Sequence, residues 1–153
     1  MTDQNDILQD ILTRLNAIDP PLKKIAVDPD DKSMTMQFIN LKDIAYITSQ
    51  ADTGRDETMF VINDDRKYYN NQSLKDLENT LEEHPHFLRT SKFYIINLTK
   101  VRGFKYSNAR DLWFEGVEEQ IENAVTNTYL EEFENRLKWS KYKQGFKSFS
   151  ILN

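Results

Sequence analysis

The spacing of apolar residues changes abruptly near residue 20, and this change restricts the possible folds. In residues 3–18 apolar side chains recur at intervals of three and four, which predicts an amphipathic helix. Asp19-Pro20-Pro21 ends the helix. From Lys23 onward apolar and polar residues alternate, which is typical of strands with one buried face. We therefore expect a mainly β domain that follows an N-terminal helix.

Short alternating segments separated by turn residues predict the strands of the first half. A polar loop at 49–57 separates two of them, and Asn63-Asp64-Asp65-Arg66 predicts a hairpin turn. The segments contain, in chain order, Ile25 and Val27; Met34, Met36 and Phe38; Ile44 and Tyr46; Met59 to Ile62; and Lys67 to Tyr69.

One short helix is expected between the strands. Ser73 is a good N-cap, Asp76 follows at the capping-box distance, and Pro85 ends the helix. Residues 86–98 are expected to form one strand, centred on 92–98, before further strands at about 100–106, 110–114 and 119–125, with a turn at 107–109. A last helix is expected to start near Thr126 or Thr128, with an apolar face of Tyr129, Leu130, Phe133 and Leu137.

The chain of 153 residues is long enough for one domain with a core. We divide it into a helical arm at 1–22, a β domain at 23–137 and a tail at 138–153. The arm is expected either to pack on its own domain or to join a second chain. The tail interleaves four lysines with aromatic residues, which suits either nucleic-acid binding or docking on the domain. The tail carries +4, so the remaining residues total −9 of the formal net charge of −5.

Several classes of protein are not supported by the sequence. There is no cysteine, so disulfides are excluded. No segment reaches the roughly 18 apolar residues of a membrane helix, and the acidic N-terminus lacks a signal-peptide pattern, so we expect a cytoplasmic protein without membrane insertion. No catalytic motif occurs, so no catalytic residue is assigned and an enzyme is not expected. His84 and His86, beside Glu82 and Glu83, make a poor metal site, and no cofactor is expected.

Four motifs occur in one order along the chain, at 41–47, 73–78, 87–98 and 124–130. Their cores are Asp-Ile-X-Tyr-Ile, Ser-Leu-X-X-Leu-Glu, Phe-X-Arg followed by Tyr-X-X-Asn-Leu, and Val-Thr-X-X-Tyr-Leu. This ordered set resembles the LytTR family of bacterial DNA-binding domains. The resemblance implies a stack of small antiparallel sheets, with one short helix between strands, that inserts loops into successive DNA grooves.

The resemblance also implies three places that face DNA. They are Gln50, Thr53 and Arg55 in the loop at 49–57; Ser91 and Lys92; and Asn127 and Thr128 at the start of the last helix. An arginine can form a fork to guanine, a lysine can neutralise a phosphate, and serine and asparagine can donate to phosphate oxygens. Where the family has a histidine this chain has Ser91, and where it has two arginines this chain has Asn127 and Thr128.

Each of these residues also has a structural interpretation. Lys92 and Arg55 are equally typical of solvated surface cations, and Asn127 is a plausible helix N-cap. Arg89 is expected to form a structural ion pair, and the Asn97 amide is expected to stabilise a turn.

The sequence therefore predicts a transcriptional regulator that binds double-stranded DNA, as a homodimer on repeated half-sites. Only some 22 residues precede the matched region, so no receiver domain is expected, and the N-terminal helix is the expected place for dimerisation or a regulatory protein partner. The alternative is a protein-interaction or sensory module with weakened or lost DNA binding, because the chain is acidic and lacks two family arginines.

Overall fold

A five-stranded antiparallel sheet lies at the centre of the protein. The computed structural model describes residues 3–18, 23–29, 32–105 and 110–138. The strand order of the central sheet is β5-β4-β3-β7-β6. Its strands are β3 (Ile44–Thr48), β4 (Thr58–Ile62), β5 (Lys67–Asn70), β6 (Phe87–Arg89) and β7 (Tyr94–Asn97). Every residue of β3 and β4 is buried, so both faces of the sheet are covered.

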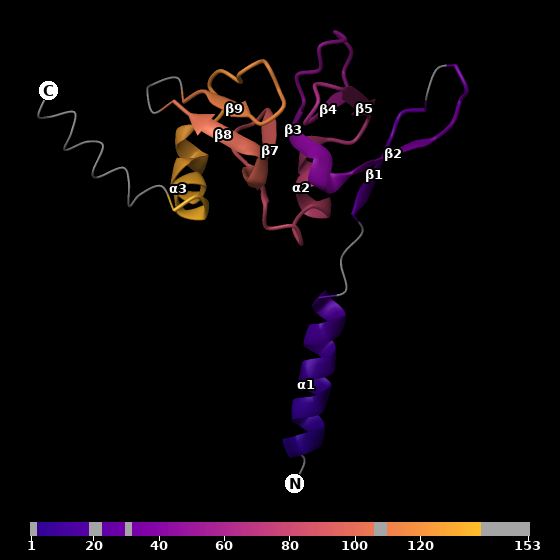
Figure 1. Cartoon of the computed structure of the whole chain (residues 1–153), viewed down its shortest axis with the longest axis vertical. Coiled ribbons are helices and arrows are strands. Elements are labelled where there is room, and N and C mark those ends of the chain that lie inside the picture. The colour runs from indigo at the N-terminus through magenta and orange to yellow at the C-terminus, as the bar shows by residue number, and fades with distance from the viewer. Residues whose placement is uncertain (1–2, 19–22, 30–31, 106–109, 139–153) are drawn as a thin grey trace, which may run out of the picture.

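Smaller elements cover the two faces of the central sheet. One core cluster joins it to the hairpin of β1 (Lys24–Val27) and β2 (Gln37–Asn40) and to α2 (Leu74–Thr80). The other joins it to the β8–β9 hairpin and α3. Here the elements are β8 (Val101–Phe104), β9 (Leu112–Phe114) and α3 (Asn127–Arg136). Figure 1 shows the two hairpins at opposite ends of the domain, which confirms the predicted stack of small antiparallel sheets.

Helix α1 (Asp3–Ile18) is confirmed with the predicted bounds. Figure 1 shows it projecting from the domain rather than packing on it. Its apolar side chains Ile7, Leu8, Ile11 and Leu12 are between 46% and 57% exposed. Within the described residues, no helix is both long and apolar enough to cross a membrane.

The predicted strand of Met34, Met36 and Phe38 is wrong in its phase. Strand β2 begins at Gln37, and its buried residue is Ile39, which pairs with Ile25 of β1. Side chains alternate between the two faces of a strand, so burial of Ile39 turns Phe38 outward. Met34 and Met36 precede the strand and are exposed as well.

Three further expectations are corrected by the structure. Residues 86–98 form two strands, β6 and β7, because a turn at 90–93 folds the segment into an antiparallel pair. Residues 119–125 form no strand and make one isolated bridge, between Ile121 and Leu112. Leu137 is 37% exposed, whereas Phe133 is fully buried as predicted. The turn at 107–109 and the tail beyond 138 lie outside the described residues.

Asn97 joins the central sheet to the turn that follows it. Its amide donates to the Ile44 carbonyl oxygen at 2.9 Å. Its Oδ1 accepts from the Thr99 backbone N–H at 3.0 Å and from the Thr99 hydroxyl at 2.6 Å. The Asn97 side chain and Ile44 are fully buried, so no water can replace the bond between them, whereas Thr99 lies at the surface. The predicted role of this amide in a turn is confirmed.

We expect Asn97→Ala to lower the free energy of unfolding by about 1–3 kcal/mol, because the buried Ile44 carbonyl loses its donor and the turn at Thr99 loses its acceptor. Chemical denaturation measures the change. Asn71→Ala, at an exposed position, is the control and should change stability by less than about 0.5 kcal/mol. Equal effects of the two substitutions would show that the buried Asn97 amide does not stabilise the fold.

Candidate nucleic-acid interface

The turn between β6 and β7 is closed by local hydrogen bonds. Ser91 is almost fully buried, and its Oγ accepts from the Phe93 backbone N–H at 3.0 Å. The Thr90 backbone N–H donates to the Tyr94 carbonyl oxygen at 3.1 Å. Ser91 was predicted to contact DNA, but the structure places its hydroxyl inside the turn, where it orders the backbone beside Lys92.

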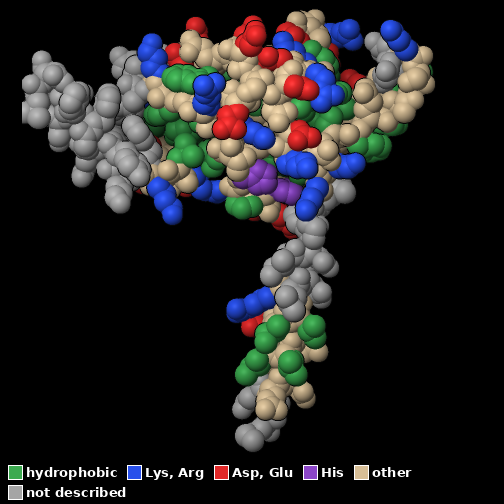
Figure 2. Space-filling model, viewed as in Figure 1, with side chains coloured by type: hydrophobic (Ala, Val, Ile, Leu, Met, Phe, Trp, Pro, Cys, Tyr) green, Lys and Arg blue, Asp and Glu red, His purple; other side chains and the backbone are tan. Residues whose placement is uncertain are grey.

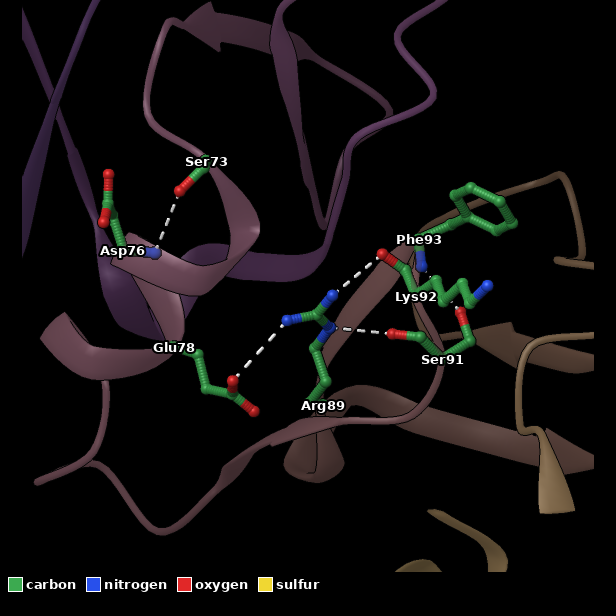
Figure 3. A network of polar contacts seen from close by, with 7 residues as sticks. All are labelled: Ser73, Asp76, Glu78, Arg89, Ser91, Lys92 and Phe93. Carbon is green, nitrogen blue, oxygen red and sulfur yellow. Dashed lines mark hydrogen bonds and ion pairs between the residues drawn. The ribbon is translucent and has the colours of Figure 1, made fainter. Parts of the chain in front are cut away.

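Arg89 holds the same turn from the other side. Its Nε donates to the Ser91 carbonyl oxygen at 2.7 Å, and Nη2 donates to the Lys92 carbonyl oxygen at 2.9 Å. Nη1 pairs with the Glu78 carboxylate of α2 at 3.5 Å, so the predicted ion pair is confirmed. Figure 3 shows the guanidinium facing these carbonyls while the side chains of Lys92 and Phe93 point away from it. Both side chains are exposed.

The start of α3 is attached directly to this turn. Thr126, not Asn127, is the N-cap residue, and Asn127 is the first helical residue. Thr126 donates to the Thr90 carbonyl oxygen from its backbone N–H at 2.9 Å and from its hydroxyl at 3.4 Å. The hydroxyl bonds to the turn instead of capping the helix, and this bond places Thr128 beside the turn.

The beginning of the 49–57 loop reaches the same place. The Ser49 backbone N–H donates to the Phe93 carbonyl oxygen at 3.1 Å. Gln50 is positioned by two contacts, a bond from its backbone N–H to the Thr48 hydroxyl at 3.0 Å and a bond from the Tyr94 hydroxyl to its Oε1 at 3.4 Å. Burial raises the pKa of Tyr94 above the ordinary tyrosine value, at which the hydroxyl is already protonated at neutral pH and can donate.

Three segments that are distant in sequence therefore line one groove, with a volume of about 530 Å³. It contains four of the predicted residues, Gln50, Ser91, Lys92 and Thr128. The sequence interpretation missed its other lining residues, which are Phe93, Tyr94, Glu122, Asn123, Thr126 and Tyr129. Lys92 is the one cation of this lining and Glu122 the one carboxylate. Amide, hydroxyl and ammonium groups of this kind bind phosphates and base edges.

Thr53 and Arg55 line a different groove, of about 320 Å³, next to Gln37 and the Tyr68–Tyr69 edge of β5. The Thr53 hydroxyl donates to Glu57 at 3.0 Å, and Arg55 lies 3.9 Å from the same carboxylate with its side chain 82% exposed. Asn127, also exposed, lines neither groove.

Asp52 attaches this part of the loop to β5. Its carboxylate accepts from the Tyr69 hydroxyl at 2.6 Å and from Lys67 at 3.0 Å, and these two bonds lower its pKa. Burial and the bond to Asp52 raise the pKa of Tyr69 to about 12. The loop is thus attached to the domain at Ser49, Gln50 and Asp52, and it contributes to two separate surfaces. Among the described residues, no cluster of three histidine or carboxylate side chains could hold a metal ion.

Comparison with known proteins identifies the family. The model of the LytTr DNA-binding domain matches residues 34–138, about two thirds of the chain. The chain belongs to the LytTr DNA-binding domain family. A LytTr DNA-binding domain from Bacillus cereus superposes with a TM-score of 0.61 at 15% identity, covering 76% of this chain and 97% of that domain. This structural match supports the fold. No curated protein matches the chain.

We expect Arg89→Ala to lower the free energy of unfolding by about 1–3 kcal/mol, because two backbone carbonyls lose a charged donor. Arg89→Lys should restore little of it, since an ammonium lacks the planar fork that reaches both carbonyls. Thermal denaturation measures both variants. Glu78→Gln, which removes the ion pair alone, should cost less than about 1 kcal/mol because its carboxylate is half exposed. Full recovery by lysine would contradict the role of the fork.

Proposed function

We propose that this LytTr protein is a transcriptional regulator that binds duplex DNA as a homodimer on repeated half-sites. The proposed DNA-binding surface surrounds the groove that is lined by Gln50, Lys92 and Thr128, called here the Lys92 groove. The observation that supports this most directly is the meeting of three distant segments in one groove. These segments are the ones that the family resemblance assigned to DNA contact. Backbone hydrogen bonds between them fix the groove before any ligand arrives, which lowers the entropic cost of binding.

Each exposed residue of the surface has a proposed role. Lys92 neutralises a phosphate, and Gln50 and Thr128 donate to phosphate oxygens or base edges. Asn127, exposed at the first turn of α3 and next to Thr128 in the chain, would extend this contact along the nucleic-acid strand. Ser91 is a positioning residue in this proposal, because its buried hydroxyl orders the backbone that carries Lys92.

Arg55 is proposed to contact a neighbouring part of the duplex. Its side chain is largely free of the domain, and its single pairing with Glu57 is long, so the guanidinium can exchange that partner for a base or a phosphate. Because Arg55 and Lys92 line separate grooves, they would meet the DNA at separate points.

Selection of bound duplexes from a random pool, followed by fluorescence anisotropy, tests the function. We expect a recurrent sequence in two copies, bound about 10³-fold or more tightly than random duplex at the same salt concentration. Equal affinity for selected and random duplexes would contradict sequence-specific regulation.

Lys92→Ala should weaken binding to the selected duplex and reduce the slope of log K against log salt by about 0.9 for each protomer, because one phosphate contact is lost. Anisotropy titrations at several salt concentrations measure the slope. The matched control is Lys75→Ala, which removes an exposed lysine on α2, away from the groove. If both variants keep the original slope, Lys92 makes no phosphate contact.

A second candidate function is a protein-interaction module with this fold. The observation that favours it is the lack of net positive charge in the groove, where the carboxylate of Glu122 offsets the ammonium of Lys92. A domain of this kind would show no salt-dependent binding to any duplex and would instead retain a protein partner through α1. Deletion of residues 1–20 separates the two functions, because binding of one domain to a duplex with a single half-site survives it and partner binding does not.

A further inference from the structure

Two apolar surfaces of the described chain have no partner. The first is the stripe of Ile7, Leu8, Ile11 and Leu12 on α1, which projects from the domain (Figure 1). The second lies on the outside of the β1–β2 hairpin, where Met34, Met36 and Phe38 are 74%, 55% and 60% exposed. Figure 2 shows hydrophobic side chains in view along α1 and beside the hairpin. Exposed apolar surfaces of this kind mark sites of association.

Strand pairing places Ala26 and Phe38 on one side of the hairpin. Ala26 is directly opposite Phe38, and both are exposed, while Ile25 and Ile39 face the core. Lys24 is opposite Asn40 at the base of the hairpin, on the same exposed side as Ala26. The outer face of the paired strands therefore carries Phe38 and Ala26 beside Lys24, and the exposed Met36 and Met34 precede Phe38 in the chain.

The helix and the hairpin match in length. A helix of 16 residues is about 24 Å long at 1.5 Å per residue. The stretch from Met34 to Asn40 spans about 20 Å if it is extended at 3.3 Å per residue. One helix can therefore cover the whole outer face, and methionine side chains adapt readily to the side chains that pack against them.

The charges of the two surfaces are complementary. Helix α1 carries Asp3, Asp6 and Asp10 against a single cation, Arg14, which is itself paired with Asp10 at 3.2 Å. The base of the hairpin carries three lysines against one carboxylate, because Lys23, Lys24 and Lys42 line a pocket there with Glu83. Pairing α1 with a second α1 would bring two helices of net charge −2 together, whereas pairing it with the hairpin brings opposite charges together.

We propose that α1 of one copy packs across the outer face of the β1–β2 hairpin of a second copy, and that the second copy returns the same contact. The exchange follows a two-fold axis, so each dimer contains the contact twice and buries both apolar surfaces of both chains. The proposal rests on the proposed function only because that function includes a homodimer. It assigns the occupant of each surface, which the family does not define.

Engineered cysteines test the pairing directly, because the chain has none of its own. The variants are Leu12→Cys on α1 and Met36→Cys on the hairpin, both in the full-length chain. We expect a disulfide-linked dimer when the two variants are mixed under mild oxidation, and little when either is oxidised alone. Covalent dimers of Leu12→Cys alone would show that α1 pairs with α1. A disulfide within the monomeric double variant would show that α1 folds back on its own chain. Either result overturns the proposal.

Sedimentation analysis provides a second test that does not depend on cross-linking. The double variant Met36→Ser, Phe38→Ser should raise the dimer dissociation constant about tenfold or more, because truncated apolar anchors weaken an interface strongly. Leu8→Ser, Ile11→Ser should do the same. The control is Leu137→Ser, another exposed apolar residue, which should leave the constant unchanged. A monomeric wild-type chain, or hairpin variants that dimerise normally, would overturn the proposal.

Binding to a duplex with a single half-site, measured with the same variants, keeps this proposal separate from the DNA-binding one. If the hairpin variants lose dimerisation and still bind one half-site as the wild type does, both proposals hold. If the dimer behaves as expected and neither protein binds any duplex, the exchange contact stands and the proposed function fails.

Discussion

The shape of the groove around Lys92 depends on the fork of hydrogen bonds that Arg89 makes to the turn between β6 and β7. Two backbone carbonyls accept from one guanidinium, and the guanidinium is anchored to α2 through Glu78. The carbonyls that face Arg89 leave Lys92 and Phe93 on the opposite side, toward solvent. The Thr90 and Phe93 carbonyls, in turn, accept from Thr126 and Ser49. One short turn therefore sets the positions of both flanking segments.

Features that depend on local chemistry could be predicted from the sequence. The Ser73 hydroxyl accepts from the Asp76 backbone N–H at 3.1 Å, as its position before an apolar stripe indicated. The Asn97 amide closes a turn at the end of a strand, which asparagine does in many contexts. Strands β3, β4 and β5 were predicted correctly as well, because strongly apolar segments between polar loops have few other ways to fold.

Features that depend on partners from elsewhere in the chain could not be predicted in this way. Phe38 and Ile39 both belong to segments with a period of two, and only the pairing of Ile39 with Ile25 decides which face meets the core. Likewise, Thr126 precedes a helix as an ordinary cap would, but its hydroxyl bonds to Thr90, 36 residues earlier. The family resemblance identified Gln50 and Thr128 as residues of the groove. It did not identify Glu122, because a strand was expected at that position.

The low net charge of the groove gives the proposed dimer, which α1 would form, a role in the proposed DNA binding. With one lysine and one glutamate in its lining, the groove offers a single domain little of the counterion release that drives nucleic-acid binding. Joining two such domains makes the second binding event intramolecular and raises affinity without any new phosphate contact. An exchange of α1 between copies would supply that joining with residues outside the DNA surface. In the proposed dimer, a chain with few cations in its groove would still discriminate among duplexes, because the spacing of two half-sites would contribute to recognition alongside the contacts of each domain.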